Sequence, residues 1–204
     1  MYALVEDNNI TQIITNPKTM VIGDVRYPAK IFQLWSKSEL NAIGIYEVIT
    51  DSSNFKDEKW YINTNESYAF ADNQVTRSWG TATPKAHADS NAVDDDGNNI
   101  LDDDGNQVIN YGLKTQLIKT IKQQASGLLA PTDWYVVKAS EVSDYSVPTN
   151  IATYRASVRT KSNEMETAIT NASDTPALET LYTYTRQEDG SVTRPLGELP
   201  TLEI

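Results

Sequence analysis

Apolar and polar residues alternate in short runs through the first part of the chain, a pattern typical of β-strands that are covered on one face. Two such runs, Tyr2–Glu6 and Ile10–Ile14, flank an Asp-Asn-Asn triplet that favours a turn, and they predict an N-terminal hairpin. Ser36 and Glu39 then have the spacing of a capping box. They predict a short helix that Gly44 ends, followed by another strand.

Three further strand-like runs follow, and an Asp-Asn turn separates the last two. They are Trp60–Asn63, Glu66–Ala71 and Gln74–Trp79. The next segment, Thr81–Asn91, is small and polar and contains the sole histidine, His87. Its composition predicts a linker or an exposed loop.

A short internal repeat comes next, because Asp94–Asn98 and Asp102–Asn106 both read Asp-Asp-Asp-Gly-Asn and apolar residues follow each. Asp-Gly favours reverse turns, so the repeat predicts a meandering β-finger. Calcium binding is the alternative interpretation. An EF-hand loop aligned on Gly97 places Ala92 at its first position and Asp103 at its twelfth, where a bidentate Glu is required. Turn formation is therefore the preferred interpretation of the aspartates.

From Leu113 the apolar residues recur every three or four positions, which predicts helices. Gly127 and Pro131 bound the first helix, and a longer amphipathic helix begins near Ile151. Thr175 is expected to cap a third, short helix with a proline in its first turn. The polar remainder of the chain predicts an extended, exposed tail.

These patterns predict an α+β chain made of four segments. Residues 1–50 are a small α+β unit, and residues 51–111 are a β-rich region with a polar loop and Asp-Gly turns. Residues 112–173 are a helical hairpin, and residues 174–204 are a short helix with an extended tail.

The composition of the chain limits which partners it is expected to bind and where it is expected to be found. The net charge of −11 would repel a phosphate backbone, so nucleic acid is not an expected partner. No apolar run approaches the ~20 residues of a membrane span, and the N-terminus lacks the pattern of a signal peptide. A soluble protein made in the cytoplasm is expected. The 11 Tyr and 4 Trp, against 3 Phe, suit half-wet interfaces.

The residue types needed for catalysis are not assembled in any recognisable motif. With no cysteine, thiol catalysis and thiolate metal sites are excluded. His87, the sole histidine, is the only candidate for a histidine general base, and it lies in a polar loop without the apolar neighbours that would position it. No Gly-x-Ser-x-Gly motif and no glycine-rich phosphate-binding loop is present. No catalytic residue, cofactor or metal site is therefore predicted, and the protein is not expected to be an enzyme.

Four residues of the helical hairpin are candidates for partner binding. Trp134 and Tyr135 follow a Pro-Thr-Asp turn, where they either pin the two helices together or lie outward as interface anchors. Apolar neighbours on both sides favour the pin. Arg155 and Arg159 lie four residues apart on one helix face, near Lys161, and either contact an acidic partner or solubilise that face.

The same hairpin carries a family resemblance. Leu128–Val137, with its Leu-Leu, small spacer and Asp-Trp, is followed by Tyr-Arg-x-x-Val-Arg within Ile151–Asn163, and the first of these helices begins at Gly112–Ile118. This pattern resembles the module of bacteriophage tail-assembly chaperone proteins. Trp35–Val48 is also similar to proteins encoded among the tail genes of marine and cyanobacterial phages. The helix and tail that follow from Thr175 depart from the chaperone pattern, in which the module is often near the chain's end.

The resemblance implies tail morphogenesis, with other phage tail or fibre proteins as partners in a homo- or hetero-oligomeric assembly. The leading hypothesis is a non-enzymatic structural protein of the virion tail, baseplate or fibre attachment. The alternative is a tail or fibre assembly chaperone that leaves before the virion matures. A third hypothesis, from another class, is a module that binds host-surface glycans through exposed Trp60, Tyr61 and Trp79.

Overall fold

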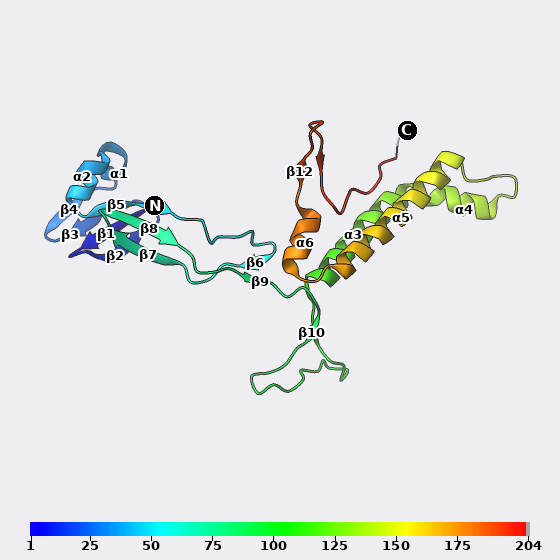
Figure 1. Ribbon diagram of the computed structural model, residues 1–204, viewed down its shortest axis with the longest axis horizontal. Helices are drawn as coiled ribbons and strands as arrows, with labels where there is room; N and C mark the ends of the chain where they lie inside the picture. Colours follow the sequence, from blue (N-terminus) through cyan, green and yellow to red (C-terminus); the bar gives the residue numbers. More distant parts are fainter. Residues whose placement is uncertain (203–204) are drawn as a thin grey trace. The chain divides into compact units, whose positions relative to one another are not determined.

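The computed structural model describes residues 1–202 and shows an α+β protein (Figure 1). The chain divides into two compact units, Met1–Thr83 and Pro84–Ile204. Each unit has its own sheet pairings and its own core, and each is described by itself.

The first unit is built on a five-stranded sheet. The strands are β1 (Tyr2–Glu6), β2 (Asn9–Ile14), β5 (Ile45–Thr50), β7 (Ser67–Ala71) and β8 (Gln74–Ser78). Their order is β2-β1-β5-β8-β7, and only the β5–β8 pair is parallel. The edge strands β2 and β7 approach each other, so the sheet is curled. Because β5 pairs with β8, the sheet joins the predicted segment 1–50 to the first part of segment 51–111, while residues 84–111 belong to the second unit.

Both predicted hairpins of this sheet are confirmed, and their turns explain why. Asp7 and Asn8, between β1 and β2, have φ of 48° and 62°. Asp72 and Asn73, between β7 and β8, have φ of 50° and 56°. Positive φ at both central residues is the type I′ geometry that matches the twist of the flanking strands, and Asn and Asp tolerate it well.

The alternation along β1 divides the apolar residues between two cores. Ala3 and Val5 face Val75 of β8 on one side, and Leu4 faces Ile45 on the other. The Leu4 side is covered by a hairpin and two short helices. These are β3 (Met20–Ile22), β4 (Val25–Tyr27), α1 (Ile31–Leu34) and α2 (Lys37–Ala42).

The predicted capping box begins α2. The Ser36 hydroxyl accepts the Glu39 N–H at 3.3 Å, and the Ser36 N–H donates to the Glu39 carboxylate at 2.7 Å. Hydrogen bonds from Ser36 lower the pKa of Glu39 below its ordinary value. Leu40 is buried in the core, and Gly44 ends the helix, as predicted, with a φ of +80°.

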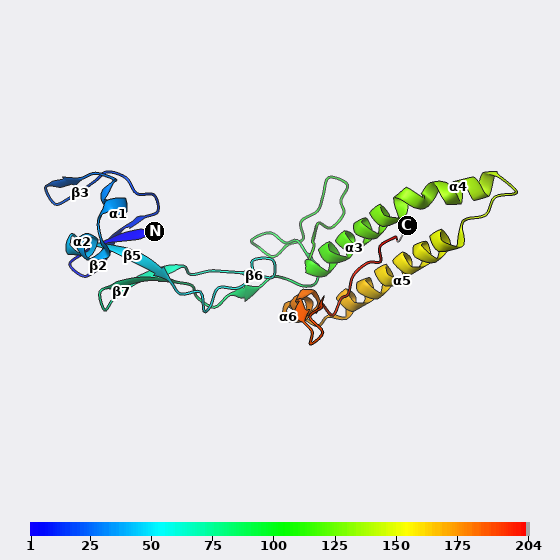
Figure 2. The same cartoon turned by 90° about the horizontal axis from the view of Figure 1, so that it is seen from above.

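The second unit is mainly helical. Its helices are α3 (Leu113–Leu129), the 3₁₀ turn η1 (Ala130–Thr132), α4 (Asp133–Glu141), α5 (Thr149–Asn171) and α6 (Thr175–Tyr182). Its strands are the two-residue pairs β10 (Ser90–Asn91) with β11 (Ile109–Asn110) and β12 (Thr185–Arg186) with β13 (Val192–Thr193). Two further short strands, β6 (Tyr61–Ile62) and β9 (Thr83–Pro84), pair with each other, and β9 lies where the first unit ends and the second begins. Figures 1 and 2 show α3 and α5 side by side, as the predicted helical hairpin.

The turn predicted at Pro131, Thr132 and Asp133, between the two helices of the hairpin, is wrong. The chain continues from α3 through η1 into α4, and it reverses only between Glu141 and Thr149. Pro131 lies at the start of η1, where its missing N–H leaves no helical hydrogen bond unmade. A Pro-Thr-Asp sequence therefore kinks the helical path here without reversing it.

The Asp-Gly repeat forms the predicted β-finger. Asp94 accepts the backbone N–H groups of Asp96 and Asn98 at 3.0 and 2.8 Å, and Asp102 does the same one repeat later. Three backbone hydrogen bonds close a ring at the base of the two loops. Ala92 N–H donates to Val108, Val108 N–H to Ile100, and Ile100 N–H to Ala92, at 2.8, 2.9 and 3.0 Å.

Thr81–Asn91, predicted as a linker or an exposed loop, is largely exposed, but its second half is also fastened to the start of α3. The Asp89 carboxylate accepts the Gly112 N–H and the Thr115 hydroxyl, both at 2.8 Å. Two backbone carbonyls of the same segment, including that of His87, accept the first N–H groups of α3. A distant segment thus supplies partners for the amides that a helix leaves unpaired at its N-terminus.

The end of the chain also differs from the prediction. Asp174, rather than Thr175, caps α6 by accepting the Ala177 N–H at 2.8 Å, and Thr175 is buried. The tail is extended but not fully exposed. Leu196 is 2% exposed, and Leu199 and Leu202 pack against the helical hairpin.

Candidate functional site

The helical hairpin has a small apolar core that fixes α5 against α3. Ala125 of α3 packs with Tyr154 and Val158 of α5, and all three are buried. The Tyr154 hydroxyl donates to the carbonyl of Leu128 at 3.2 Å, which satisfies its polar end. The core ends where α3 passes into η1.

Arg155 holds that junction from the opposite helix. One guanidinium nitrogen, Nη1, donates to the carbonyl of Leu129 at 2.9 Å and to the Thr132 hydroxyl at 2.6 Å. The other, Nη2, pairs with the Asp133 carboxylate at 2.8 Å. A planar guanidinium can bind three acceptors at once, so a single side chain joins the end of α3, η1 and the start of α4 to α5. We call this set of contacts the Arg155 junction.

The prediction that Arg155 lies on an outward face is therefore wrong, since its side chain is 8% exposed and its donors are engaged within the chain. Arg159 does lie outward, and its hydrogen bond to the carbonyl of Arg155 is long, at 3.4 Å. Of the two arginines, only Arg159 is placed to meet a partner. Lys161 is half-buried and pairs with Glu164 at 3.3 Å.

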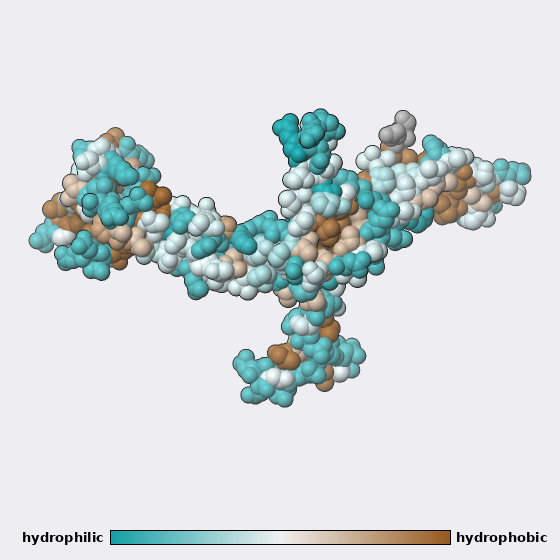
Figure 3. Space-filling model, viewed as in Figure 1, coloured by the Kyte–Doolittle hydropathy of each residue, from teal (hydrophilic) through white to brown (hydrophobic). Residues whose placement is uncertain are grey.

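Beyond the junction, α4 buries none of its side chains. Trp134 and Val137 are 52% and 53% exposed, and the Trp134 ring stacks on Tyr135 with centroids 4.0 Å apart. The exposed apolar residues of this helix and its end, which we call the α4 surface, are Trp134, Val136, Val137 and Val142. Figure 3 shows apolar side chains gathered on this part of the second unit.

The interpretation of Trp134 as a pin between helices is wrong, and the alternative, an outward aromatic, is what the structure shows. Tyr135 is half-buried beneath it. Lys138 lies 5.7 Å from the Trp134 ring and 4.3 Å from the Tyr145 ring, a cation–π arrangement that leaves the apolar face of the helix open. An exposed aromatic and aliphatic cluster of this kind is typical of the centre of a protein interface.

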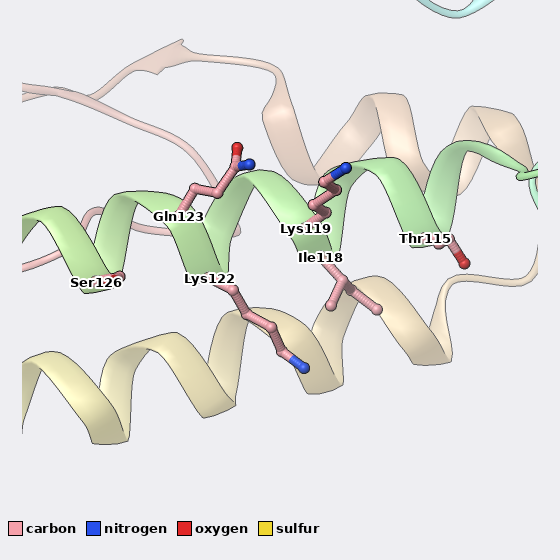
Figure 4. A pocket seen from close by; sticks show the side chains of 6 residues that line it. All are labelled: Thr115, Ile118, Lys119, Lys122, Gln123 and Ser126. Atoms are coloured by element: carbon pink, nitrogen blue, oxygen red, sulfur yellow. The ribbon is translucent and has the colours of Figure 1, made fainter.

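A shallow groove of about 530 Å³ runs along α3 (Figure 4). Its lining residues are Thr115, Ile118, Lys119, Lys122, Gln123 and Ser126. All come from one face of one helix, and Lys122 is paired with Glu166 of α5 at 3.3 Å. Small-molecule sites usually gather polar groups from several elements around an enclosed cavity, which this groove does not.

Among residues 1–202, no three His, Cys, Asp or Glu side chains lie close enough to hold a metal ion. In the finger, the carboxylates of Asp94 and Asp102 bind their own turns. Hydrogen bonds from the backbone of Asn98 and Asn106, respectively, lower the pKa of these two groups. The aspartates therefore have a structural use as turn residues.

The aromatic platform expected for glycan binding is not exposed. Trp60 and Tyr61 are each 3% exposed. Trp79 is half-buried, packs edge-on against Phe55 with ring centroids 4.8 Å apart, and lies under the Arg77 guanidinium at 4.4 Å. The prediction of three exposed aromatics in the first unit is wrong.

No helix among the described residues has both the length and the apolar character needed to cross a membrane. Comparison with protein-family models, with curated proteins and with solved structures finds no match to this chain. The function must therefore be inferred from the geometry of the helical unit and from the sequence pattern of its hairpin.

Proposed function

We propose that this protein is a non-enzymatic, tail-associated structural protein of a bacteriophage that docks onto another tail or fibre protein through the α4 surface. The observation that carries the proposal is a helix of nine residues that buries none of its side chains and displays a tryptophan. Such a surface stays in water only at a cost in free energy, which a partner removes by covering it.

The way α4 is held supports docking. Isolated helices of this length are only marginally stable in water, because forming the first turn costs more free energy than a few further turns recover. The Arg155 junction secures the first residues of α4, and Val142 N–H still bonds the carbonyl of Lys138 at 2.9 Å at its other end. A helix formed in advance of binding loses less entropy when a partner covers it.

The sequence resemblance of the hairpin supports a phage tail or fibre protein as the partner. Leu128–Val137 and Ile151–Asn163, which carry the resemblance to phage tail-assembly proteins, are the segments that build the junction and the α4 surface. We therefore place the protein in the virion tail, as one component of an oligomeric assembly.

A second candidate is a tail or fibre assembly chaperone that is not retained. The same exposed helix would then cover an apolar segment of an unassembled tail protein and leave before maturation. The two functions share the α4 surface and differ in whether the chain stays in the particle.

Quantitative mass spectrometry of purified virions separates them. The structural role requires this chain in mature particles. Its absence there, together with a soluble complex with an unassembled tail protein in infected cells, would establish the chaperone instead. Absence from both would overturn the proposal.

The role of the α4 surface is tested in phages that encode Trp134→Ala. Loss of a central interface tryptophan costs about 2 kcal/mol or more, so we expect incorporation to fall by about 30-fold. Tyr111→Ala is the matched control, because Tyr111 is 63% exposed and lies outside α4. Equal incorporation of the two variants would show that docking does not use α4.

A further inference from the structure

Two leucines near the end of the described chain pack into the seam between α3 and α5. Leu199 and Leu202 lie against the buried cluster of Ala125, Tyr154 and Val158, and Leu196, which precedes them, is 2% exposed. Figure 2 shows this C-terminal segment running between the two helices. The helical hairpin thus binds an extended peptide that happens to belong to its own chain.

Two backbone hydrogen bonds position the start of that peptide. Leu196 N–H donates to the carbonyl of Leu181, in the last turn of α6, at 3.0 Å, and Gly197 N–H closes a turn on the carbonyl of Arg194 at 2.9 Å. Gly197 has a φ of +71°, at which any other residue would be strained, and the Lys161 ammonium lies 2.8 Å from the position that a Cβ on Gly197 would occupy. The segment that starts at this turn and enters the seam reads Leu-Gly-x-Leu-x-x-Leu.

Few contacts attach this segment to the helices beyond Gly197. Within the described chain, residues 198–202 make no backbone hydrogen bond to α3 or α5. Glu198 bonds only to Arg194 and Tyr184, which belong to the same tail. The half-buried side chains of Leu199 and Leu202 are what attach the segment to the helices, and their burial is opposed by the entropy lost on ordering it.

The connection to the rest of the unit is exposed. Every residue from Thr183 to Thr193, which includes the β12–β13 hairpin, is exposed. The chain contacts α6 again only after this tether, where the Arg194 guanidinium lies 5.3 Å from the Tyr182 ring and Leu196 N–H bonds the carbonyl of Leu181. An exposed tether before a small docked segment is the arrangement that permits exchange between identical chains.

We propose that the seam between α3 and α5 is a docking site for residues 196–202 of a second copy of this chain. The leucines of an exchanged tail make the same contacts with α3 and α5 as those of the chain's own tail, so the outcome depends on concentration. Exchange competes with a tethered tail whose effective concentration is on the order of millimolar, a level that copies held together in an assembly reach. The site is separate from the α4 surface, and its failure would leave the proposed function untouched.

The first test empties the seam in the full-length chain. In Leu199→Asp/Leu202→Asp, two half-buried residues of the tail become charged and the helices are unchanged. A fluorescent peptide of residues 193–202 should bind this variant at least about tenfold more tightly than wild type, whose seam is occupied. The same peptide with both leucines replaced by Asp should not bind, and a Gly197→Ala peptide should bind at least about tenfold more weakly.

The second test asks whether a whole chain supplies the tail. Isotopically heavy wild type is mixed with the light double variant at about 1 mM, the concentration scale of the tethered tail. Native mass spectrometry should show a mixed dimer, and the double variant alone should give none. Equal peptide affinity for the two proteins would overturn the proposal. Peptide binding without a mixed dimer would overturn it as well, since the seam would then hold only its own tail.

Discussion

Replacing Arg155 with methionine should destabilise the helical unit and release α4, whereas the same change at Arg159 should do neither. The two arginines lie one turn apart on α5, so they share a helix and a change in charge. Arg155 is buried and Arg159 is exposed. The pair therefore isolates the junction from the general effect of removing a positive charge from an acidic protein.

The magnitude follows from the hydrogen bonds that Arg155→Met removes. Thr132 is 2% exposed, so water does not readily replace the bond that its hydroxyl accepts, and the Leu129 carbonyl loses a bond of 2.9 Å but keeps the Thr132 hydroxyl as a donor at 2.7 Å. A hydrogen bond from a charged group contributes about 1.5–3 kcal/mol. Asp133 is 59% exposed, so its ion pair contributes at most about 1 kcal/mol. Methionine retains part of the packing of the arginine stem, and we expect a net loss of about 2–4 kcal/mol.

Urea unfolding followed by far-UV circular dichroism measures this loss, because the long helices all belong to the second unit. Hydrogen exchange of residues 129–141 should accelerate in Arg155→Met alone, since those amides depend on the junction. Arg159→Met should stay within about 0.5 kcal/mol of wild type. Equal losses for the two variants, or unchanged exchange in α4, would refute the assignment of Arg155 as the residue that holds the junction.

Trp134→Ala should leave the free energy of unfolding of the purified protein within about 0.5 kcal/mol of wild type by urea denaturation, because the ring is exposed. Gly112→Ala should lower the melting temperature, since a Cβ would collide with the backbone of Ala88, whereas Gly127→Ala, with open space on α3, should raise stability by up to about 1 kcal/mol. Ser36→Ala should cost about 1 kcal/mol in the first unit and return the pKa of Glu39, followed by NMR titration, towards its ordinary value. Since folding lowers that pKa, the Glu39 contribution is complete above the ordinary value of 4.5 and is lost as the pH falls through the lowered one.

The elements that the sequence predicted well depend on residues close together in the chain. The capping box needs only Ser36 and Glu39, and the first hairpin needs only the conformational tolerance of Asp7 and Asn8. Turn and cap chemistry is local, so a single sequence contains it in full. The helical hairpin could be predicted for a related reason, because its apolar residues recur at helical spacing over many turns.

The candidate site was predicted less well because its contacts are long-range. Arg155 bonds to a threonine 23 residues earlier in the chain, and Asp89 reaches 23 residues forward to Gly112. Trp134 stands among leucines and valines, as a core residue would, but local apolarity does not tell whether another element covers it. One signal was present, since Arg155 lies four residues after Ile151 and on the same buried face of the helix.

The hydrogen-bonded ring of the finger is a place where the chain can be shortened or lengthened by one whole Asp-Gly loop. Each Asp-Gly loop leaves the ring and returns to it within eight residues, so the stalk of β10 and β11 need not move when a loop is altered. Removing one repeat would leave Ala92 still paired with Val108, as in an ordinary hairpin. The finger is therefore the position at which an affinity tag or a fluorophore-binding sequence can enter this protein without disturbing the helices.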